Sequence, residues 1–131
     1  MDTITQLMLT VGWAGMLMGA LSGAALGLFF HDEKWMGGYA SFRRRLARLG
    51  HISFFGLGFL NLLFAFTYHV SGLPGAWGGV AAVGLIVGAA TMPLCCFLAA
   101  WRKPLRHLFP IPVTGVVVGV VGTLAGLLTG G

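Results

Sequence analysis

Charged residues are scarce in this sequence. They make up 8% of the 131 residues, whereas 57% are apolar and the mean hydropathy is +0.90. Soluble domains carry roughly 25% charged residues, so this composition excludes an ordinary soluble domain and indicates an integral membrane protein. Cysteines are also few. Cys95 and Cys96 are adjacent, and because a bridge between neighbours is strained, they predict no disulfide framework.

Acidic residues are nearly absent, with Asp2, Asp32 and Glu33 as the complete set. The sequence has no evident nucleophile and base pair and no glycine-rich phosphate loop after a strand. We therefore expect no enzymatic activity, or at most a non-catalytic subunit of an oxidoreductase complex. The apolar stretches also lack the charge or polar stripe of a selective channel. The net charge is +5, and the basic residues that produce it lie beside apolar stretches. This favours lipid headgroups and not nucleic acid as the partner.

Four apolar stretches are long enough to cross a bilayer. They cover approximately residues 4–30, 52–70, 77–101 and 108–129. About 20 apolar residues span the hydrocarbon core, and a free backbone group finds no partner there, so each stretch should be a helix. The predicted fold is an all-α membrane protein, a four-helix transmembrane bundle formed by one domain over residues 1–131. The first stretch lacks a preceding Lys or Arg and is long for a signal peptide, which favours a retained helix.

The basic residues predict the orientation of these helices. All of them fall in two connections, 31–51 and 102–107, and none lies between the second and third stretches. The positive-inside rule therefore places both connections inside and both termini outside, in the periplasm of a bacterial-type cytoplasmic (inner) membrane. Each half of the chain is a span, a basic connection and a returning span, which suggests a tandem repeat of two helical hairpins.

The seven basic side chains nearest the spans are interpreted as anchors for lipid headgroups. Ser41 is a candidate N-cap for a helix that continues into the second span. The alternatives to a headgroup anchor are a phosphate-bearing ligand and an acidic partner protein. The seven residues are Arg43, Arg44, Arg45, Arg48, Arg102, Lys103 and Arg106.

Glycines recur at helical spacing in the first and fourth stretches, and small residues at such spacing let another helix approach closely. We expect packing faces there, either against helices of the same chain or against another subunit. The mid-span amide of Asn61 should seek an interhelical hydrogen bond, or line a path for a solute or protons. The glycines are Gly15, Gly19, Gly23 and Gly27 in the first stretch, and Gly115, Gly119, Gly122 and Gly126 in the fourth.

Three histidines flank the basic connections. His31 ends the first span, His51 opens the second and His107 opens the fourth, so all three are expected at the inner interface. Imidazoles at equal depth on different helices would suit the axial ligation of a haem b iron or the binding of another metal. No spacing motif supports this, and an interface also suits histidines without a function.

The sequence favours a small accessory or assembly subunit of a larger inner-membrane complex, with respiratory electron transfer as one setting. It would bind membrane lipids and dock on other membrane subunits, or on copies of itself, through its glycine-rich faces. Two alternatives remain: a haem b or metal-binding electron carrier that uses the three histidines, and a small homo-oligomeric transporter or channel.

Overall fold

The computed structural model describes residues 1–130 and contains four long helices in that range, with no strand. All four are long and apolar enough to cross a membrane, as predicted. They are α1 (Thr3–Phe29), α2 (Phe42–Ser71), α3 (Gly75–Trp101) and α4 (Pro110–Thr129), with two short 3₁₀ segments, η1 (Trp35–Gly37) and η2 (Lys103–Leu108).

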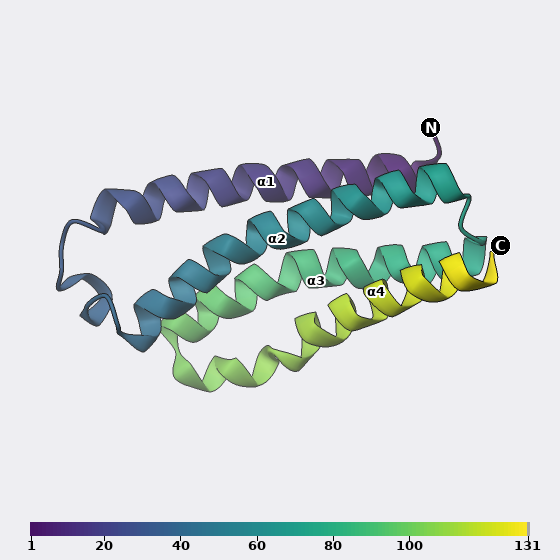
Figure 1. The fold of residues 1–131 in the computed structure, drawn as a ribbon. Coiled ribbons are helices and arrows are strands. Elements are labelled where there is room, and N and C mark those ends of the chain that lie inside the picture. Colours follow the sequence, from purple (N-terminus) through teal and green to yellow (C-terminus); the bar gives the residue numbers. More distant parts are fainter. Residues whose placement is uncertain (131) are drawn as a thin grey trace.

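The helices form an open row, not a closed bundle (Figure 1). Each packs mainly on its neighbour in sequence, α1 on α2, α2 on α3 and α3 on α4. At the end near the termini α1 also reaches α3, and Met8, Ala65 and Ala81 from the first three helices are completely buried there. The predicted all-α fold of four long helices is confirmed, and α1 and α4 share no extensive contact within residues 1–130.

Both termini lie at one end of the row, and the two basic connections lie at the other (Figure 1). Asp2 caps α1 at the terminal end. Its carboxylate accepts hydrogen bonds from the Thr5 hydroxyl at 2.6 Å and the Thr5 amide at 2.9 Å, and these bonds lower the pKa of Asp2. The basic end carries all eight Lys and Arg residues and two carboxylates, for a net charge of +6 with neutral histidines.

The glycines of α1 face α2 over only part of their length. A Cβ atom on Gly15 would lie 3.2 Å from the Cα of Gly58, and one on Gly19 would lie 2.8 Å from the Phe55 ring. Gly23 lies under the His51 ring, whereas Gly27 faces open space. Gly27 therefore packs against no other helix within residues 1–130, and its docking on another subunit stays a prediction. Each four-residue step turns a glycine by about 40° around the helix, so Gly27 is about 120° away from Gly15.

The glycines of α4 stay against α3 along the whole helix. Gly115, Gly119, Gly122 and Gly126 are all buried, and their partners on α3 and at its start are Gly84, Leu85, Ala81 and Leu73. Their spacing of 4, 3 and 4 residues keeps them within about 60° of each other around the helix. At the centre, a Cβ atom on Gly84 would lie 2.6 Å from the Gly115 carbonyl oxygen. Backbone therefore touches backbone in this hairpin.

Asn61 lies at the centre of α2 and is completely buried. Its amide nitrogen donates to the Leu57 carbonyl of the same helix at 2.8 Å, and its Oδ1 atom has no hydrogen-bond partner. The expected interhelical hydrogen bond is therefore not formed within residues 1–130.

Candidate functional site

The connection between α1 and α2 folds into a compact cap at the basic end. Gly37 and Gly38 have φ values of 85° and 97°, which suit glycine, and Met36 has a φ of 54°, which is unusual for a side-chain-bearing residue. The Ser41 hydroxyl donates to the Met36 carbonyl at 2.6 Å and accepts from the Arg44 amide at 3.2 Å. One residue thus closes the turn and begins α2 as its N-cap, as the sequence predicts.

Arg44 is the central residue of this cap. It was expected to reach lipid headgroups, but its side chain is only 2% exposed. Its guanidinium donates to the carbonyls of Phe30 at 3.0 Å and Asp32 at 3.4 Å. It also lies against three aromatic rings, at 4.8 Å from the centroid of Phe30, 5.7 Å from Trp35 and 5.8 Å from Tyr39. These carbonyls and ring faces partly compensate its charge and hold the loop onto α2.

Arg48 extends this arrangement one turn further along α2. Its guanidinium stacks on the Tyr39 ring at 4.2 Å from the centroid and donates to the Tyr39 carbonyl at 3.3 Å. Tyr39 therefore covers both arginines. The remaining five of the predicted anchors are exposed, and Lys103 lies 5.3 Å from the centroid of the Phe42 ring. Those five are Arg43, Arg45, Arg102, Lys103 and Arg106.

A cavity of about 440 Å³ opens inside the cap, lined by Phe30, Glu33, Tyr39 and Arg44. It contains one carboxylate, one guanidinium and two aromatic faces. Two buried nitrogen atoms of the neighbouring arginines, Nε of Arg44 and Nη1 of Arg48, have no hydrogen-bond partner. The cap thus combines a cavity lined by a guanidinium and a carboxylate with two buried arginine nitrogens that lack partners.

His51 lies in the contact between α1 and α2. Since α2 begins at Phe42, His51 lies more than two turns inside the helix, about 14 Å from its start. Its Nδ1 atom is 3.2 Å from the hydroxyl of Ser22 on α1, and its ring packs edge-on against Phe55. His51 is therefore half-buried between α1 and α2, directly before the apolar stretch that begins at Ile52.

His31 and His107 lie outside the long helices, and both are exposed. His31 follows α1, and His107 belongs to η2 before α4. Within residues 1–130 no group of three or more His, Cys, Asp or Glu side chains could hold a metal ion. The three histidines therefore form no such group, and their ligation of a haem iron stays a prediction.

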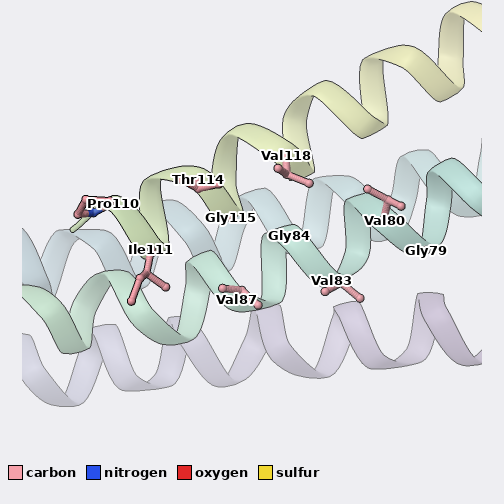
Figure 2. A pocket seen from close by; sticks show the side chains of 10 residues that line it. All are labelled: Gly79, Val80, Val83, Gly84, Val87, Pro110, Ile111, Thr114, Gly115 and Val118. Carbon is pink, nitrogen blue, oxygen red and sulfur yellow. The ribbon is translucent and has the colours of Figure 1, made fainter. Parts of the chain in front are cut away.

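An apolar groove of about 740 Å³ runs along the contact between α3 and α4 (Figure 2). Gly84 and Gly115 lie at its centre, and exposed valines of both helices border it (Figure 2). Val80, Val83 and Val87 recur at spacings of 3 and 4 on α3, as Ile111, Gly115 and Val118 do on α4. Such spacings on two adjacent helices form the ridges between which a third helix packs.

Sequence reasoning missed Trp35, Tyr39 and Ser22 as site residues. The two aromatics stand in a basic segment, and aromatics interleaved with arginines are a recognisable signal for cation–π contacts. The contact of Ser22 with His51 has no such signal, since it depends on the register between α1 and α2.

Known protein families, characterised proteins and solved structures give no significant match to this chain.

Proposed function

We propose that this protein is a non-catalytic accessory or assembly subunit that packs against a larger integral membrane protein. The observation that carries this proposal is the groove between α3 and α4, with ridges of branched apolar side chains on both sides and glycines between them. Ridges with this spacing can interdigitate with the side chains of a third helix. The occupant that this shape favours is a membrane-spanning helix of the partner.

The glycine faces are not the docking surface in this proposal. Seven of the eight predicted packing glycines face α2 or α3 of the same chain, so they are already occupied. The partner must therefore use surfaces that the row leaves open. In this row α4 packs mainly on α3, so one side of the α3–α4 pair is left open.

In the proposed topology, the basic end faces the cytoplasm and both termini face the periplasm of a bacterial-type inner membrane. All eight Lys and Arg residues lie at one end of the row, and this asymmetry supports that orientation under the positive-inside rule. The two hairpins would then be tandem repeats related by an axis along the membrane normal.

The test is site-specific photo-crosslinking from the groove in native membranes. A photoreactive residue at Val83 or Val118 should yield one crosslinked membrane protein of defined mass, and native mass spectrometry should find the same protein in a stoichiometric complex. The control position is Val117, which is exposed on α4 but does not line the groove. It should give no such product.

A groove-filling substitution, Val83→Trp, should dissociate that complex, whereas Val117→Trp should leave it intact. Both valines are more than half exposed, so neither substitution disturbs a buried position. Crosslinks only to lipid, or only to a second copy of this chain, would overturn the proposal.

A further inference from the structure

The first turn of α2 carries a concentration of positive charge. Arg43, Arg44 and Arg45 occupy this turn, and it contains no acidic residue. The N-terminal end of a helix carries a partial positive charge, so three cations here are unfavourable unless an anion is close. An anion at this place would interact favourably with the arginines and with the helix end.

Among the three arginines of this turn, Arg44 is the buried one. Its hydrogen-bond partners are neutral carbonyl groups, and no carboxylate is among them in the part of the chain from 1 to 130. Its Nε atom and the Nη1 atom of Arg48 are buried donors without partners. Buried donors normally have partners, and a guanidinium suits two oxygen atoms of a phosphate.

The cavity beside Arg44 also contains a group of opposite charge. Glu33 lines the same space as Arg44, together with the rings of Phe30 and Tyr39. A simple anion would face the Glu33 carboxylate and be repelled by it. A group with a phosphate and a cationic amine matches both charges, and the aromatic faces suit the cation.

We propose that this cap binds the phosphoethanolamine headgroup of a membrane lipid. The phosphodiester would accept hydrogen bonds from Arg44 and Arg48, and the ammonium group would lie at Glu33. The cap follows directly after α1, a helix apolar enough to span the membrane, so a headgroup in the adjacent leaflet can reach it. The site is independent of the groove between α3 and α4.

The test measures lipid binding to the full chain by native mass spectrometry in detergent. The probes are phosphatidylethanolamine and phosphatidylglycerol of the same acyl composition, each added separately. The native protein should retain phosphatidylethanolamine at least about tenfold more tightly than phosphatidylglycerol, because only the first carries a partner for Glu33. Equal retention of both lipids would contradict the assignment of the amine.

Three substitutions separate the roles of the residues. Arg48→Gln should weaken phosphatidylethanolamine binding about tenfold, since charge-assisted hydrogen bonds to phosphate are the strong ones. Arg45→Gln is the matched control, because Arg45 is exposed in the same turn and carries the same charge. It should leave binding unchanged. Glu33→Gln should remove the preference between the two lipids and keep binding to both.

Arg44→Gln should abolish binding, and circular dichroism shows whether that variant still folds. If it does not fold, Arg48→Gln and Glu33→Gln decide the question, since Glu33 is exposed and Arg48 only half-buried. Inorganic phosphate is the competing source of the same chemistry. Displacement of the lipid by inorganic phosphate at similar concentration, or equal loss of binding in Arg45→Gln and Arg48→Gln, would overturn the proposal.

Discussion

The two hairpins are built on glycines but use them differently. In the α3–α4 hairpin, glycines of both helices meet at the centre, and those of α4 stay in contact with α3 along its length. In the α1–α2 hairpin, the glycine contact is close only at Gly12, Gly15 and Gly58. Toward the basic end, the rings of Phe55 and His51 lie over the next two α1 glycines. The difference arises from the spacing of the glycines around each helix.

The two hairpins also differ in the polar groups that they hold between their helices. At the centre of α3–α4 the two helices meet backbone to backbone. Toward the basic end of α1–α2 an imidazole lies between the helices, and beyond it the connection folds over a buried arginine. The polar chemistry of the molecule is therefore concentrated in the first hairpin.

The largest effect is expected from Gly84→Ala in the second hairpin. The added Cβ atom would lie 2.6 Å from the Gly115 carbonyl oxygen and 2.7 Å from the Gly119 amide nitrogen. Backbone atoms cannot rotate away, so the helices must separate, and the free energy of unfolding should fall by about 3 kcal/mol. Unfolding in mixed micelles, followed by circular dichroism, measures this change.

Gly79→Ala serves as the control for that substitution. It lies on the same helix, and an added Cβ atom there would meet nothing within 4 Å. The alanine should be neutral or stabilise the protein by up to about 1 kcal/mol through helix propensity. Equal effects of the two substitutions would show that α3 and α4 do not pack as described.

A smaller effect is expected from Gly19→Ala in the first hairpin. The added Cβ atom would lie 2.8 Å from the ring of Phe55, which is a side chain and can shift. The free energy of unfolding should fall by about 1 kcal/mol, and the double variant with Phe55→Leu should recover most of that loss. The same unfolding assay applies, and Gly27→Ala is the control because that position is open. A loss as large as that of Gly84→Ala would remove the distinction between the hairpins.

The spans and the Ser41 cap could be predicted because hydropathy and capping depend on local sequence. The order of helices in the row could not. A valine that faces lipid and one that faces α4 are chemically alike in a membrane, so apolar periodicity does not separate them. Glycine spacing says more about which face packs on another helix, provided that the rotation of about 100° per residue is taken into account. Gly27 shows this, because it keeps the four-residue spacing and yet faces open space.

The cap around Arg44 could not be predicted from the sequence, for a different reason. Seven basic residues near the spans are equivalent in sequence, and what distinguishes Arg44 is the fold of the connection over it. That fold depends on Met36 and Gly37 with positive φ, and on three aromatic rings that converge from different parts of the loop. A long-range arrangement of this kind has no fixed spacing in the sequence.

The smallest effect is expected at Asn61, the buried polar residue of the first hairpin. Its side chain bonds to the Leu57 carbonyl of its own helix, and its Oδ1 atom is buried without a partner. Removing an unsatisfied buried oxygen is favourable, and a main-chain carbonyl inside a helix keeps its backbone partner. Valine is close to asparagine in size, so Asn61→Val should raise the free energy of unfolding by between 0 and about 1 kcal/mol.

If Asn61 instead holds two helices together, the same substitution should lower the free energy of unfolding by about 1 kcal/mol. The sign of the change, measured in the same unfolding assay, decides whether the amide contributes to packing between helices.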